Sequence, residues 1–133
     1  MDLLGKYRIL RLLGEGATSK VFLAHDPFGN RDVAIKIVAR GVRDGEEGSG
    51  GSKSERFQKK FFVAEASLAG KLTHPHIVQI FDAVAEADPA YIVMEYVRGG
   101  TLERHTQPEH LLPVGDVLEM IFKCTRALDF VWR

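Results

Sequence analysis

The glycine-rich run from Gly14 to Val21 constrains the fold of this chain more than any other feature. It reads Gly-Glu-Gly-Ala-Thr-Ser-Lys-Val, and strand-forming residues stand on both sides of it, at Tyr7–Leu13 and Lys20–His25. A dinucleotide-binding turn needs such a run between a strand and a helix, whereas strand character resumes here at Val21. A P-loop needs Gly-Lys-Ser or Gly-Lys-Thr, and this chain has Ser19-Lys20 in the reverse order. The run therefore predicts a hairpin between two antiparallel strands.

The rest of the chain adds three more predicted strands. Runs of β-branched and aromatic residues place these strands at Asp32–Val38, Ile77–Phe81 and Ala90–Glu95. The first of them follows a predicted turn at Asp26–Asn30, which is rich in turn residues. The segment 41–54 contains five glycines and almost no apolar residue, so it cannot bury enough surface to offset its ordering entropy. We expect a mobile loop there. Within it, Gly48–Ser52 is typical of an engineered linker and of a natural insertion alike.

Helical periodicity appears in two places, with a short helix expected between them at Thr101–His105. The first stretch runs from about residue 54 to residue 72, and the residue before Pro75 disfavours its continuation. Its apolar residues at spacings of three and four are Phe57, Phe61, Ala64, Leu68 and Leu72. The second stretch follows Pro113. Its apolar stripe comprises Val117, Met120, Ile121, Cys124, Leu128 and Val131.

Composition restricts the class of protein. Hydrophobic residues make up 45% and charged residues 27%, and eighteen basic residues balance eighteen acidic ones. Nothing in this balance favours nucleic acid or an anionic membrane surface as a bulk partner. The single cysteine, Cys124, excludes an internal disulfide, and its place in the apolar stripe predicts an inert core thiol. No signal peptide or spanning segment is present, so we expect a cytoplasmic chain, and a membrane anchor beyond residue 133 is compatible with that expectation.

Five motifs in a fixed order identify a family resemblance. The glycine run is followed by Val33-Ala34-Ile35-Lys36, by Glu65 within Ala64-Glu65-Ala66, by His74-Pro75-His76-Ile77-Val78, and by Tyr91-Ile92-Val93-Met94-Glu95-Tyr96-Val97-Arg98-Gly99-Gly100. From about Tyr7 to its last residue, the chain resembles the bacterial serine/threonine protein kinases that look like eukaryotic ones. A glycine-rich hairpin followed by a strand lysine is the kinase arrangement for holding ATP phosphates.

The resemblance implies an α+β fold. Residues 1–97 would form the kinase small lobe, with a five-stranded antiparallel sheet and the helix that the family calls C. Residues 98–133 would form the exit from the hinge and the first two helices of an incomplete large lobe.

The resemblance also implies an ATP site. Glycines at 14 and 16 let the hairpin backbone approach phosphate oxygens and offer N–H donors. Ser19 stands where the family has a third glycine. Met94 would be the gatekeeper, with the Glu95 carbonyl and the Val97 amide pairing with adenine. The full predicted set is Leu13, Gly14, Glu15, Gly16, Ala17, Thr18, Ser19, Val21, Ala34, Lys36, Met94, Glu95 and Val97.

Lys36 is the predicted phosphate-binding cation. A lysine within an apolar strand needs an anionic partner, since desolvating it unpaired is costly. The resemblance supplies Glu65, nine residues before His74, as that partner. In the family this ion pair forms only when the helix swings inward, so it also acts as an activity switch. His74 and His76 have no third or fourth metal ligand near them in the sequence, so they predict a turn and no metal site.

The 133 residues contain neither His-Arg-Asp nor Asp-Phe-Gly, which carry the catalytic base and the Mg²⁺ ligands in this family. The first hypothesis is therefore the ATP-binding portion of a kinase that phosphorylates protein serine or threonine, unable to transfer phosphate by itself. The alternative is a short, non-catalytic module that binds nucleotide or a protein, as a pseudokinase does. Residues 117–131 lack a covering layer and predict self-association through that helix.

Overall fold

The computed structural model describes residues 2–17, 19–38, 53–87 and 89–133, except for the side chains of 53–59 and 63. Thr18 and nearly all of the expected mobile loop 41–54 lie outside the described residues. The chain divides into two compact units. The first comprises Met1–Lys71 and Gln79–Tyr96, and the second comprises Leu72–Val78 and Val97–Arg133. Each is described separately.

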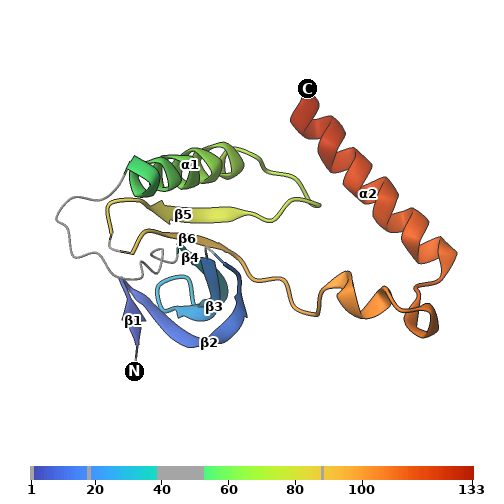
Figure 1. Cartoon of the computed structure of the whole chain (residues 1–133), viewed down its shortest axis with the longest axis horizontal. Helices are drawn as coiled ribbons and strands as arrows, with labels where there is room; N and C mark the ends of the chain where they lie inside the picture. Colours follow the sequence, from blue (N-terminus) through green and yellow to red (C-terminus); the bar gives the residue numbers. More distant parts are fainter. Residues whose placement is uncertain (1, 18, 39–52, 88) are drawn as a thin grey trace. The chain divides into compact units, whose positions relative to one another are not determined.

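The first unit is built on one antiparallel sheet of six strands in the order β1-β2-β3-β4-β6-β5 (Figure 1). The strands are β1 (Leu3–Leu4), β2 (Tyr7–Glu15), β3 (Ser19–Asp26), β4 (Arg31–Val38), β5 (Ile80–Val84) and β6 (Tyr91–Glu95). Five of them were predicted. The sixth, β1, has two residues and pairs with the start of β2 through a turn at Gly5, whose φ is +58°. A Cβ at Gly5 would lie 2.7 Å from the Tyr91 hydroxyl, so this turn requires glycine.

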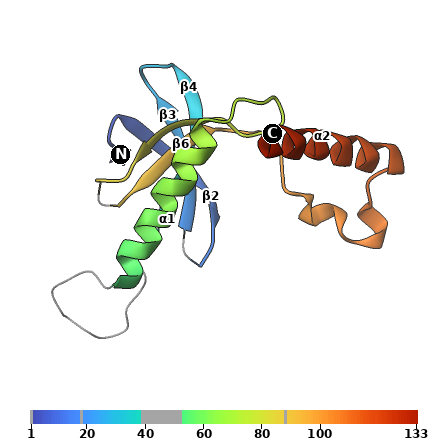
Figure 2. The ribbon, with the colours of Figure 1, turned by 90° about the horizontal axis from the view of Figure 1, so that it is seen from above.

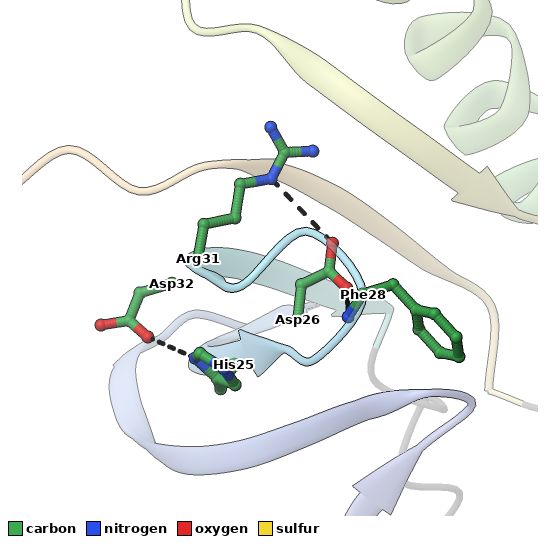
Figure 3. A network of polar contacts seen from close by, with 5 residues as sticks. All are labelled: His25, Asp26, Phe28, Arg31 and Asp32. Atoms are coloured by element: carbon green, nitrogen blue, oxygen red, sulfur yellow. Dashed lines mark hydrogen bonds and ion pairs between the residues drawn. The ribbon is translucent and has the colours of Figure 1, made fainter.

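The turn between β3 and β4 is fixed by Asp26 (Figure 3). Its carboxylate is only 5% exposed and accepts a hydrogen bond from the Phe28 backbone N–H at 3.0 Å. The backbone N–H of Gly29 has the largest effect on this carboxyl and lowers its pKa. The N–H of Phe28 lowers the pKa further. The next pair along the ladder, His25 and Asp32, is joined at 3.0 Å. The predicted turn is therefore confirmed, and these contacts fix the register between β3 and β4.

Helix α1 (Lys53–Gly70) lies along β5 and covers one face of the sheet (Figures 1 and 2). Phe62 and Ala66, four residues apart, are 7% and 3% exposed and pack with Ala90 and Ile92. The predicted buried face is wrong where it can be tested. Phe61 and Leu68 are 63% and 69% exposed, because the adjacent apolar row through Phe62 faces the sheet instead.

The opposite face of the sheet holds the largest buried cluster of side chains. Its buried members are Tyr7, Ala24, Val33, Ile35, Tyr91 and Val93. The rings of Tyr7 and Tyr91 meet edge to face with centroids 6.4 Å apart. Burial raises the pKa of both phenols, and Asp82 raises them further. Each residue of β4 therefore belongs to one of two layers, with Val33 and Ile35 on this side and Ala34 and Lys36 on the other.

The second unit contains two 3₁₀ turns, η1 (Leu102–His105) and η2 (Pro108–His110), and the helix α2 (Val114–Trp132). The first was predicted as a short helix, and α2 matches the predicted helix after Pro113. Only Ala127 is buried among the residues of α2. Cys124 is exposed, so its predicted place in a core is wrong for this structure. No packed layer covers its side of α2 within the described part of the chain.

Candidate nucleotide-binding site

The glycine run forms the predicted hairpin between β2 and β3. Gly14 pairs with Val21 and Glu15 pairs with Lys20, and the Gly16 N–H donates to the Ser19 carbonyl at 2.8 Å. The Lys20 ammonium lies 3.2 Å from the Glu15 carboxylate. A Cβ built at Gly14 would meet nothing within 4 Å, so the space beside this glycine is open. The backbone here is therefore accessible to a ligand that approaches closely.

The strand register aligns the predicted site residues in two rows on the face that α1 partly covers. Direct partners in an antiparallel ladder project to the same side of the sheet. The first row runs from β2 to β6 through Gly14, Val21, Lys36 and Ile92. The second runs from β3 to β5 through Leu23, Ala34, Met94 and Ile80.

The second row is apolar throughout. Ala34 is 6% exposed, and Met94 packs against the cluster that contains Phe62 and Ile92. A flat apolar ligand on this row would lie beside Ala34, with Lys36 one step further along β4. An apolar row beside a lysine has the chemistry to match a group with an apolar end and an anionic end.

Lys36 and Glu65 do not meet in this structure. Lys36 is half-buried and Glu65, beside the buried Ala66 on α1, is exposed. Both belong to the described residues, and no ion pair within 4.0 Å joins them. The predicted pair is thus unformed here, and its role stays a prediction.

The end of β6 is held from two sides. The Glu95 N–H donates to the Gln79 carbonyl at 2.8 Å, and the Gln79 N–H donates back to a Glu95 carboxylate oxygen at 3.2 Å. On the other side, the Arg11 guanidinium donates to the Tyr96 hydroxyl at 3.4 Å. Val97, 63% exposed, is the first residue of the second unit after β6.

Three of these residues, Arg11, Gln79 and Tyr96, were missed by sequence reasoning. Each acts through a contact with a residue distant in the sequence, and no local pattern marks such a contact. Leu13, which was predicted, lies in the irregularity of β2 between Leu12 and Gly14 and is half-buried. Glu15, Gly16 and Ala17 are exposed on the hairpin and Ser19 is half-buried.

The second unit has a hollow of about 710 Å³ beside α2. Its lining residues are His74, Phe122, Thr125, Arg126, Asp129, Phe130 and Arg133. The His74 ring lies 5.1 Å from the Phe130 ring, and its Nδ1 accepts the His76 N–H at 3.1 Å, as the predicted turn requires. No group of three histidine, cysteine or acidic residues suited to a metal occurs in the part of the chain described. No helix within those residues is long and apolar enough to span a membrane.

The fold agrees with what comparison with known proteins finds. The family model described as "Protein kinase domain" matches residues 7–133. The chain belongs to the protein kinase domain family.

Two bacterial serine/threonine kinases are among its relatives. It is 38% identical over 120 residues to serine/threonine-protein kinase PrkC of Bacillus subtilis, covering 88% of this chain and 17% of that protein. It is 36% identical over 98 residues to PknD of Chlamydia caviae, covering 74% of this chain and 10% of that protein. The PknI kinase domain of Mycobacterium tuberculosis is similar in structure, with a TM-score of 0.72 and 27% identity, covering 96% of this chain and 47% of that one. The resemblance noted in the sequence is confirmed, and the chain spans less than a fifth of these two curated relatives.

Proposed function

We propose that this chain is the ATP-binding portion of a serine/threonine protein kinase, with residues 1–97 as its small lobe and 98–133 as the start of its large lobe. The observation that carries the proposal is the alignment of Gly14, Val21 and Lys36 in one row beside Ala34 and Met94 in the next. Adenine would lie on the apolar row. The phosphates would lie between the hairpin backbone and the Lys36 ammonium.

In this proposal, residues of this chain bind both the base and the phosphates of ATP. Leu13, Val21, Ala34 and Met94 would enclose the base, while the backbone of Glu95 and Val97 would supply one acceptor and one donor for its edge. The remaining hairpin residues, Glu15, Gly16, Ala17, Thr18 and Ser19, would cover the phosphates. Lys36 would bind the α- and β-phosphates once Glu65 moves inward to pair with it.

The residues that the structure describes do not fit a magnesium site. The part of the chain described here has no cluster of three possible ligands, and the 133 residues lack the Asp-Phe-Gly sequence. In the family, Mg²⁺ would supply positive charge that stabilises the phosphates, and the Asp-Phe-Gly aspartate is one of the residues that would hold it. Transfer of the γ-phosphate to a protein serine or threonine therefore requires residues other than these, and the relatives' names support that substrate class.

Thermal unfolding with and without ATP tests the proposal. A ligand at one hundred times its Kd stabilises the folded chain by about 2.7 kcal/mol, which raises the Tm by several degrees. Lys36→Met should abolish that rise, because it removes the phosphate-binding charge and leaves the strand apolar. Lys71→Met is the matched control, since Lys71 is exposed directly after α1 and belongs to neither row. An equal rise in wild type and Lys36→Met would contradict the assignment of Lys36.

A further inference from the structure

The hydrogen bond between Arg11 and Tyr96 spans the sheet without following a strand pair. Arg11 belongs to β2, and Tyr96 directly follows β6. Two strands, β3 and β4, separate β2 from β6 in the sheet order. Three strand spacings amount to about 14 Å along a flat sheet. Two long side chains must therefore reach toward each other over the face, and the sheet curls to bring them together.

The register places this contact at one end of the candidate site. Arg11 pairs with Leu23, which pairs with Ala34, so Arg11 projects from the same face as the apolar row. Tyr96 lies two residues beyond Met94, on the side away from Lys36. We call the space over the two rows the nucleotide slot. The Arg11–Tyr96 hydrogen bond, referred to below as the bridge, lies at the end of this slot that is farther from Lys36.

Leu13, which is proposed above to help enclose the base, lies close to this bridge in the sequence. It lies two residues after Arg11 on β2, in the irregularity where β2 leaves its regular pairing with β3. An irregular segment is held less firmly by its ladder than a regular one. A tether from Arg11 to Tyr96 therefore restrains this part of β2 against the end of β6.

We propose that Arg11 and Tyr96 form a positioning pair that holds Leu13 over the base end of the nucleotide slot. This inference rests on the proposed nucleotide site and adds to it a specific contact between β2 and the residue after β6. Because the pair lies at the end of the rows away from Lys36, its effect should fall on the base and not on the phosphates.

The experiment measures the Kd of ATP and of adenosine by isothermal titration calorimetry for the 133-residue chain and its variants. Tyr96→Phe removes only the accepting oxygen, Arg11→Gln removes the donor, and the double variant completes a cycle. Arg8→Gln is the matched control, since Arg8 is an exposed arginine on the same strand with no polar contact among the described residues.

We expect each single variant to raise the Kd of ATP and the Kd of adenosine by the same factor. That factor should be about two- to tenfold, as for one lost hydrogen bond. The double variant should be no weaker than either single one. The Tm without nucleotide should fall by a few degrees at most, because the same contact is also lost from the free chain. Lys36→Met should raise the Kd of ATP and leave the Kd of adenosine unchanged.

Three results would overturn the inference. The positioning role is wrong if Tyr96→Phe has the same Kd for ATP and adenosine as Arg8→Gln. If Lys36→Met still weakens ATP binding in that case, the proposed nucleotide site stands. If the Arg11 and Tyr96 effects are additive, or fall on ATP alone, the two residues do not act together on the base. If the wild-type chain binds neither ligand, the proposed function fails and this inference fails with it.

Discussion

Replacing Ile35 with valine should destabilise the sheet while leaving the candidate nucleotide site intact. Ile35 is fully buried, at 0% exposed, and packs in the cluster with Val33 and Val93 on the face of β4 opposite Lys36. Removing one methylene group from such a position costs about 0.5–1.5 kcal/mol, and Ile35→Ala should cost about 2–5 kcal/mol. Domain stabilities are about 5–15 kcal/mol, so both losses are measurable.

The aromatic residues provide the assay. Tyr7 and Tyr91, 3% and 6% exposed, belong to the same cluster as Ile35, so tyrosine absorbance during urea unfolding reports this core. Trp132, the single tryptophan, is 90% exposed in the second unit, and its fluorescence does not report the sheet. Ile121→Val is the matched control, because Ile121 is 56% exposed on α2.

The prediction has two parts that can fail separately. Ile35→Val should lower the urea midpoint with an unchanged slope, and it should change the Kd of ATP by less than about twofold because the other face of β4 is untouched. A midpoint indistinguishable from that of Ile121→Val would show that Ile35 is not in a packed core. A large loss of ATP affinity at unchanged stability would show that the two faces of β4 are wrongly assigned.

Three further predictions concern Asp26, Glu65 and α2. The backbone N–H of Gly29, and after it that of Phe28, holds the folded pKa of Asp26 below its ordinary value. The stability of the wild type over Asp26→Asn should therefore be complete above the pKa of an unfolded aspartate, about 3.9, and decline as the pH falls through the folded pKa; a difference in urea midpoint that is constant from pH 6 to pH 2.5 would contradict this. Glu65→Ala should change the free energy of unfolding by less than about 0.5 kcal/mol, because this side chain is exposed and unpaired with Lys36, and a loss of several kcal/mol in the same assay would indicate a formed ion pair. Self-association through residues 117–131 should weaken in Leu128→Lys, since Leu128 is 69% exposed on α2; sedimentation of wild type and variant as the same monomer would refute it.

Local sequence patterns predicted most of the strands of the sheet and the turns between them. The glycine run and its flanking strands predicted the β2–β3 hairpin, and the residues Asp26–Asn30 predicted the next turn. Strand β5 was predicted at Ile77–Phe81 and lies at Ile80–Val84. The Ile77 N–H donates to the His74 carbonyl at 3.1 Å, so the turn continues to that point, and pairing with β6 sets where the strand begins. That pairing is a tertiary contact and leaves no mark in the local sequence.

The face of α1 shows the same limit. The row predicted from the sequence runs through Phe61, whereas the structure buries Phe62, its neighbour on the next row. Burial of Phe62 and Ala66 against Ala90 and Ile92 decides between the rows, and only the folded sheet supplies that surface. The contact from Arg11 to Tyr96, 85 residues apart, is likewise set by how the sheet curls.

The most direct measurement of the central claim is the change in backbone amide NMR shifts when ATP is added to the chain. We predict that the shifts change along the glycine hairpin from Gly14 to Val21, at Ala34 and Lys36, and over Met94–Val97, and that Lys36→Met removes the changes on the hairpin. Changes confined to residues 102–132, or none at saturating ATP, would contradict the account.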